Sequence, residues 1–137
     1  MYTSKIFVTV DVVLIKPKLQ QLLLIQRKKE PFKDCWALPG GFVDENEDLE
    51  AAAKRELLEE TNVKVDSLVQ IGAFGKPFRD PRSHTVSVAY FGNVADDTVA
   101  IAADDANEAN WFPIQDLPEL AFDHQDIISN ALKKFTL

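Results

Sequence analysis

The sequence predicts an α/β (α+β) fold in which a mixed β-sheet lies between α-helices. Strand-like runs occur on both sides of a long helical segment, and a second helical segment lies near the end of the chain. A sheet that is apolar on both faces is buried when a helix packs on each of them. With 137 residues, 46% of them hydrophobic, the chain has the size and composition of one globular domain. We therefore expect a single domain over residues 1–137.

The first elements predict a β-hairpin. Residues 5–15 and 20–27 are rich in β-branched and other apolar residues, and the turn-like segment KPKLQ separates them. A loop with several turn-forming residues follows and ends at Pro39-Gly40-Gly41. This loop leads directly into the long helical segment.

That helix is predicted over residues 47–61. Asn46 is the expected N-cap, and the acidic Glu47 and Asp48 fall in the first turn, where they complement the helix dipole. A helix is favoured because leucine, alanine, glutamate and lysine dominate the segment.

The second half predicts three strands and a final helix. Residues 63–74 and 84–94 form two strands around the loop GKPFRDPRS, and residues 110–112 form a third, short one. Residues 123–135 form the last helix, because apolar side chains recur at a spacing of four in Ile127, Ala131 and Phe135.

Composition limits the classes of partner. The formal net charge is −7, whereas a protein that binds nucleic acid through its phosphates needs a surplus of lysine and arginine. An anionic ligand would instead require a divalent cation as a neutralising partner. Cys35 is the only cysteine and the N-terminal run contains Asp11, so we expect a cytoplasmic protein without disulfides or a membrane span.

Three carboxylates crowd into five positions at the end of the predicted central helix. At about 100° per residue, Glu56 and Glu60 lie within about 20° of Leu49 and continue the small apolar stripe, while Glu59 lies roughly 80° away on the same side. Like charges at this spacing repel each other. The pattern therefore predicts an inward-facing, preformed cradle for a cation, rather than a solvated acidic face.

Magnesium is the cation that suits such a cradle. It prefers oxygen ligands, retains several waters, and is held by one or two carboxylates while substrate phosphates complete its shell. Gly40 and Gly41 lack side chains, so the backbone before the helix can approach a ligand closely and turn a carbonyl toward it.

The spacing of this segment resembles the Nudix box, the signature of hydrolases that split nucleoside diphosphates linked to another moiety. The matching residues run from Gly41 to Val63 and include Glu47, Arg55, Glu56, Leu57, Glu59 and Glu60. The one departure is Asn62, where the family has glycine. Asparagine is the other residue that tolerates a left-handed helix end.

The resemblance implies a Nudix fold and a bound Mg²⁺ or Mn²⁺. The resemblance implies that Glu56, Glu59 and Glu60 are catalytic residues and metal ligands. It also implies that the Gly40 carbonyl is a further metal ligand. Gly41, Glu47 and Arg55 then have structural roles in the box. Arg55 would orient the acidic side chains of Glu47 or Glu59.

A second stretch, KPFRDPRSHTVSVAYFG, is similar to Nudix enzymes that act on ADP-ribose and to related regulators of NAD metabolism. In this loop Arg79 and Arg82 are candidates for contacts with phosphate or ribose, because a guanidinium can donate two parallel hydrogen bonds. Phe78 could stack on adenine or be partly buried in the core. His84 and His124 are expected to have capping or surface roles.

The predicted activity is Mg²⁺-dependent hydrolysis of a small-molecule nucleotide, with ADP-ribose giving AMP and ribose 5-phosphate. The general base stays open between a box glutamate and the later candidates Asp104, Asp105 and Glu108. The alternatives are hydrolysis of an oxidised nucleoside triphosphate or another nucleotide sugar, or a domain that senses ADP-ribose without cleaving it. Relatives in the family are commonly homodimers, so a homodimer is a further expectation from the resemblance.

Overall fold

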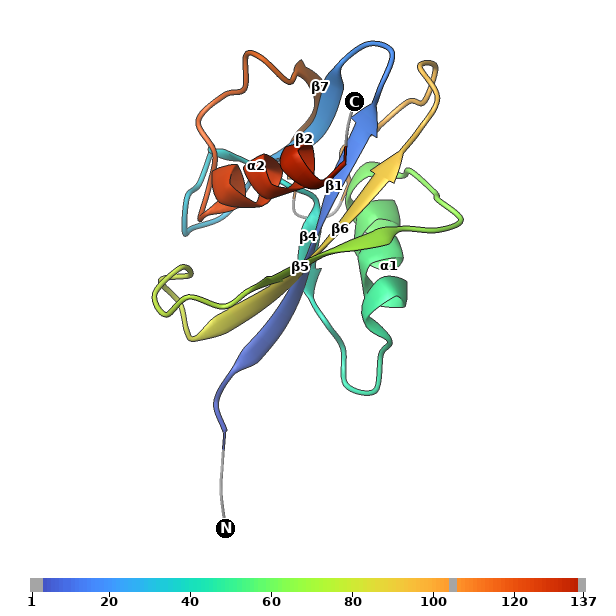
Figure 1. Ribbon diagram of the computed structural model, residues 1–137. Helices are drawn as coiled ribbons and strands as arrows, with labels where there is room; N and C mark the ends of the chain where they lie inside the picture. Colours follow the sequence, from blue (N-terminus) through green and yellow to red (C-terminus); the bar gives the residue numbers. More distant parts are fainter. Residues whose placement is uncertain (1–3, 104–105, 136–137) are drawn as a thin grey trace.

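The computed structural model describes residues 4–103 and 106–135, in which a mixed β-sheet carries one helix on each face (Figure 1). The helices are α1 (Leu49–Thr61) and α2 (His124–Lys134). The strands are β1 (Phe7–Lys16), β2 (Gln21–Arg27), β3 (Trp36–Ala37), β4 (Gly40–Phe42), β5 (Val69–Phe74), β6 (Thr85–Asn93) and β7 (Ala106–Pro113). The predicted fold class is confirmed.

Strand β1 organises the sheet because it changes partners along one edge. Near its start, Thr9 to Asp11 pair antiparallel with β4, whereas near its end Ile15 and Lys16 pair antiparallel with β2, which confirms the predicted hairpin. The other edge of β1 pairs in parallel with β6 along almost its full length. Since β2 and β4 diverge between these two pairings, space for a cavity opens beside Asp11.

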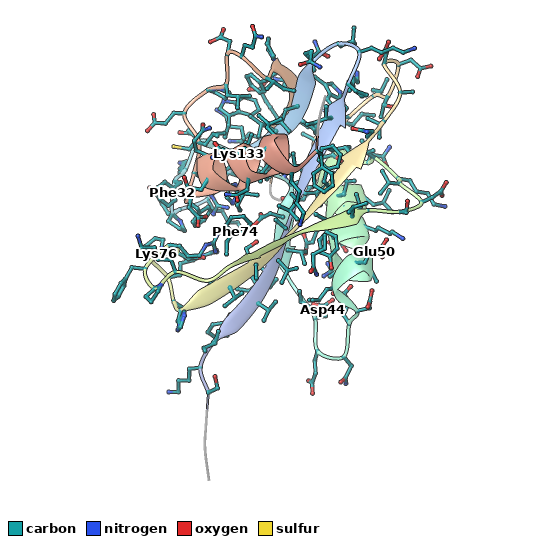
Figure 2. The ribbon with its side chains drawn as sticks, in the orientation of Figure 1. Phe32, Asp44, Glu50, Phe74, Lys76 and Lys133 are labelled. Atoms are coloured by element: carbon teal, nitrogen blue, oxygen red, sulfur yellow. The ribbon has the colours of Figure 1, made fainter. Side chains whose placement is uncertain are left out.

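Both faces of the sheet are buried. Alternate residues of β1 point to opposite faces, so Val10, Val12 and Leu14 pack in the α1 core while Val13 and Ile15 pack in the α2 core. In Figure 2 the labelled Asp44 and Glu50 lie on the α1 side of the sheet, and Phe32 and Lys133 lie on the α2 side. Asp11 belongs to the series that faces α2.

Helix α1 begins and ends at residues that cap it. Asp48 is the N-cap, and its carboxylate accepts a hydrogen bond of 3.1 Å from the amide of Ala51. The predicted cap at Asn46 is therefore wrong: Asn46 adopts a left-handed φ of 64° in the preceding turn. At the other end Asn62 adopts φ 60° and its amide bonds to the carbonyl of Leu58. The expected left-handed end is confirmed.

Two strand predictions need correction, and two short strands were not predicted. The strand expected over 63–74 begins only at Val69, and the short strand expected at 110–112 extends over all of β7. Strands β3 and β4 went unpredicted because they hold two and three residues. Within the described ranges, no helix is both long and apolar enough to cross a bilayer.

Candidate active site

A cavity of about 260 Å³ opens where β1 changes partners from β4 to β2. Its buried lining combines apolar residues with the carboxylates of Asp11, Glu60 and Asp80, and its rim is exposed and rich in cations. The floor includes Asp11, Ile25, Ala37, Leu38 and His124, and the rim includes Lys28, Lys29, Glu30, Phe42 and Arg82.

The C-terminal end of α1 reaches this cavity beside the glycine pair. Glu60 is 8% exposed, lines the cavity, and accepts a hydrogen bond of 2.7 Å from the Gly40 amide. Glu56 packs against Gly41 so closely that a Cβ there would lie 2.6 Å from its carboxyl carbon. Any side chain at either glycine would therefore clash with its neighbours. The inward orientation of Glu56 and Glu60 deduced from the helical angles is confirmed.

The guanidinium group of Arg55 binds carboxylates on the neighbouring face of α1. It donates to both oxygens of Glu47 at 2.6 and 2.8 Å, to Glu56 at 2.9 Å and to Glu59 at 3.2 Å. It also donates to the carbonyl of Phe42 in β4. These contacts connect the start of the box, its helix and the adjacent strand.

The surroundings of Glu47 and Glu56 shift the pKa values of these two carboxylates in opposite directions. Hydrogen bonds from Arg55 and from the Asp44 amide lower the pKa of Glu47 to about 2. Burial raises the pKa of Glu56, against the opposing effect of Arg55. Glu47 is therefore a permanent anion paired with Arg55, whereas the charge of Glu56 lacks full compensation from the protein.

The donor chemistry at the end of α1 fits a magnesium or manganese ion. Carboxylate oxygens of Glu60 and Glu56 lie against Gly40 and Gly41 respectively, and such hard oxygen donors are those that Mg²⁺ prefers. Among residues 4–103 and 106–135, no three histidine, cysteine, aspartate or glutamate side chains already converge on a metal position. Arg55 and the Gly40 amide hold these carboxylates instead.

Both candidate arginines of the β5–β6 loop line the cavity, and both are paired with carboxylates. Arg79 donates from Nε and Nη2 to the two oxygens of Asp123 at 2.9 and 2.6 Å, and its side chain is only 4% exposed. Arg82 makes the same two-armed contact with Asp80, at 3.0 and 2.7 Å. The two arginines therefore hold the loop in place whatever else they contact.

The remaining candidates lie away from the cavity or outside the described residues. Phe78 is 93% exposed, so the alternative of partial core burial is wrong, and it is not among the described residues that line the cavity. Glu108 lies exposed in β7, opposite Gln26 of β2. Asp104 and Asp105 fall outside the described residues.

Several cavity residues were missed by the sequence reasoning, among them Asp11, Phe122 and His124. Asp11 and His124 are 7% and 4% exposed, so the surface role expected for His124 is wrong. Phe122 forms part of the wall, with the guanidinium groups of Arg27 and Arg82 at 5.0 and 5.4 Å from its ring centre. The available signal was Asp11 itself, a single charge inside an apolar strand.

Comparison with known families identifies the family of the chain. The model of the NUDIX domain matches residues 5–133, which is nearly the whole chain. The chain belongs to the Nudix family. It is 46% identical over 115 residues to an ADP-ribose pyrophosphatase of Methanocaldococcus jannaschii, covering 82% of this chain and 66% of that protein. It is 37% identical over 118 residues to the ADPR responsive transcriptional repressor NtrR of Acinetobacter baylyi, covering 83% and 47%. This Nudix chain thus spans about half to two thirds of the length of these relatives.

Solved Nudix structures resemble the chain over almost its full length. The NUDIX domain of Shewanella oneidensis NrtR complexed with ADP ribose gives a TM-score of 0.90 at 34% identity, covering 98% of this chain and 91% of that one. A bifunctional NMN adenylyltransferase/ADP ribose pyrophosphatase of Francisella tularensis, complexed with AMP and a Mn ion, gives 0.86 at 32% identity, covering 96% and 42%.

Proposed function

We propose that this Nudix chain hydrolyses the pyrophosphate bond of ADP-ribose, using one water and releasing AMP and ribose 5-phosphate. The observation that carries the proposal is the position of Glu60 and Glu56 against the Gly40-Gly41 loop, which lines the cavity together with Glu60. The similarity to an ADP-ribose pyrophosphatase and to a domain complexed with ADP ribose supports the choice of substrate.

In this proposal Glu56, Glu60 and Glu59 would hold Mg²⁺ or Mn²⁺, together with the Gly40 carbonyl. A bound divalent cation would neutralise phosphate oxygens and lower the pKa of a coordinated water. Glu59, whose side chain is 45% exposed, is the ligand best placed to orient the attacking water from the solvent side. Arg55 would keep these carboxylates within reach of one another while the site is empty.

The β5–β6 loop would provide one side of the substrate site. The paired guanidinium groups of Arg79 and Arg82 each keep one terminal nitrogen outside their two-armed ion pairs, which can donate to a phosphate or ribose oxygen. Phe78 stays a candidate for stacking on a base only if the loop closes over the ligand, because its ring is exposed.

The test is magnesium-dependent release of AMP from ADP-ribose, with products identified by mass. Glu60→Gln should reduce kcat by orders of magnitude while the thermal midpoint stays close to that of the unmodified chain. Glu45→Gln is the matched control, because it makes the same chemical change at an exposed residue of the loop before α1. Near-full activity of Glu60→Gln would show that the metal assignment is wrong.

A second candidate function is binding of ADP-ribose without turnover. It is favoured by the similarity to an ADPR responsive transcriptional repressor. The same assay separates the two functions: a sensing domain binds ADP-ribose in calorimetry but releases no AMP with either Mg²⁺ or Mn²⁺. A panel of oxidised nucleoside triphosphates and nucleotide sugars, run in parallel, decides between ADP-ribose and other substrates.

A further inference from the structure

Asp11 is a buried carboxylate on the floor of the cavity, and the proposed chemistry gives it no role. It lies in the middle of β1, between the fully buried Val10 and Val12, and is itself 7% exposed. A buried carboxylate costs free energy unless hydrogen bonds or charges compensate it. Its position at the junction with β4 and its exposure to the cavity indicate a ligand contact.

Two neighbours fix the orientation of this carboxylate. Ser87 of β6 donates its hydroxyl to Oδ2 of Asp11. His124, the first residue of α2, accepts the Leu38 amide on Nδ1 at 3.0 Å, so the ring proton of the neutral imidazole lies on Nε2. Nε2 lies 3.5 Å from Oδ1 of Asp11.

Oδ1 therefore retains capacity to accept a further hydrogen bond. A separation of 3.5 Å exceeds the 2.7–3.2 Å typical of an N–H···O bond, so His124 satisfies this oxygen only weakly. Oδ1 also lies next to the glycine loop, since a Cβ on Gly40 would approach it to 2.6 Å. The under-satisfied oxygen thus lies beside Gly40, next to the proposed metal ligands.

The rim and the floor of the cavity differ in charge. Lys28 and Lys29 are exposed on the rim, where they can attract a diphosphate. Arg79, which also lines the cavity, uses Nε and Nη2 in its two-armed ion pair with Asp123. A phosphate oxygen placed directly against Oδ1 of Asp11 would meet another acceptor, whereas a hydroxyl or amine could donate to it.

We infer that Asp11 is a specificity-determining residue, which accepts a hydrogen bond from a neutral hydroxyl or amine of the moiety attached to the diphosphate and excludes a further phosphate. The inference rests on the proposed function and deepens it. It assigns to the site nucleoside diphosphates that carry a sugar or similar neutral group, in preference to nucleoside triphosphates. Ser87 and His124 are positioning residues, because they act through the orientation of Asp11.

The test compares ADP-ribose with ATP as substrates of the full chain, with Mg²⁺, before and after Asp11→Asn. Asparagine keeps the size of the side chain but replaces one acceptor oxygen by a donor. We expect KM for ADP-ribose to rise at least tenfold while kcat changes less than threefold. The ratio of kcat/KM for ADP-ribose over that for ATP should fall by a larger factor, because asparagine can donate to a phosphate oxygen. Asp116→Asn, the same change at an exposed turn, is the matched control and should leave the ratio unchanged.

An unchanged substrate ratio in Asp11→Asn, or an equal loss of kcat on both substrates, would overturn the inference. Calorimetric titration with intact ADP-ribose gives an independent readout. If the unmodified chain binds ADP-ribose but cleaves neither substrate, the proposed hydrolysis fails. The inference on Asp11 would then still require at least tenfold weaker binding by the variant. Equal affinity of the two forms would refute it.

Discussion

Replacing Asp123 by asparagine removes the carboxylate that neutralises Arg79, and the structure allows the effect to be estimated. The Arg79 side chain is 4% exposed, whereas that of Asp123 is 20% exposed. Breaking a buried ion pair from one side costs about 3–5 kcal/mol, because the remaining charge is left in a poorly solvated position. Asparagine retains one acceptor oxygen, so we expect a loss of about 3 kcal/mol, at the low end of that range.

This loss corresponds to a measurable change in melting temperature. For 137 residues the entropy of unfolding is about 0.29 kcal/mol per kelvin, which gives a decrease of roughly 10 °C. Arg79→Met should cost less, about 1–3 kcal/mol, because the remaining Asp123 can still reach water. The double variant removes both charges and should be more stable than Asp123→Asn alone.

Calorimetry and urea unfolding at pH 7 measure these differences, and steady-state kinetics measure the effect on activity. The reasoning is refuted if Asp123→Asn loses less than about 1 kcal/mol, or if the double variant shows the sum of the two single losses. A large loss of kcat/KM in Arg79→Met with no loss of stability would instead indicate that Arg79 serves the substrate alone.

Two further predictions concern the end of α1 and the pH dependence of stability. Asn62→Ala should lose about 1–2 kcal/mol in urea unfolding, because φ is 60° there and alanine is strained in that conformation, whereas Asn62→Gly should stay within about 0.5 kcal/mol of the unmodified chain. Equal losses in both variants would contradict this explanation. Burial lowers the pKa of His124 below its ordinary 6.5, and the positive charges of Arg79 and Arg27 lower it further. The negative charges of Asp11 and Asp123 oppose this decrease. The unfolded chain therefore binds more protons just below pH 6.5, so the stability from neutral His124 is complete above pH 6.5 and is lost as the pH falls. His124→Gln should flatten the slope of unfolding free energy against pH below 6.5, and identical slopes would exclude this role for His124.

The helical periodicity of the box was sufficient to predict which way its carboxylates face. Leu49, Glu56 and Glu60 share one side of α1 in any regular helix, because the angle between residues depends only on local backbone geometry. The left-handed end at Asn62 follows for the same reason, since few residues tolerate that conformation. The N-cap was misplaced by two residues because Asn46 and Asp48 are both good caps, and the turn that selects Asp48 depends on Glu47 contacting Arg55.

The sequence by itself determined the fold class, the helix that carries the box and the acidic chemistry at its end. Only the tertiary structure decided what surrounds that chemistry. Asp11 and His124 are more than a hundred residues apart and meet because β1 lies against α2. Arg79, judged from its loop to be a candidate for substrate contact, is paired with Asp123 from the start of α2. Local sequence constrains backbone angles and the faces of single elements, whereas the partner of a buried charge depends on which distant elements pack together.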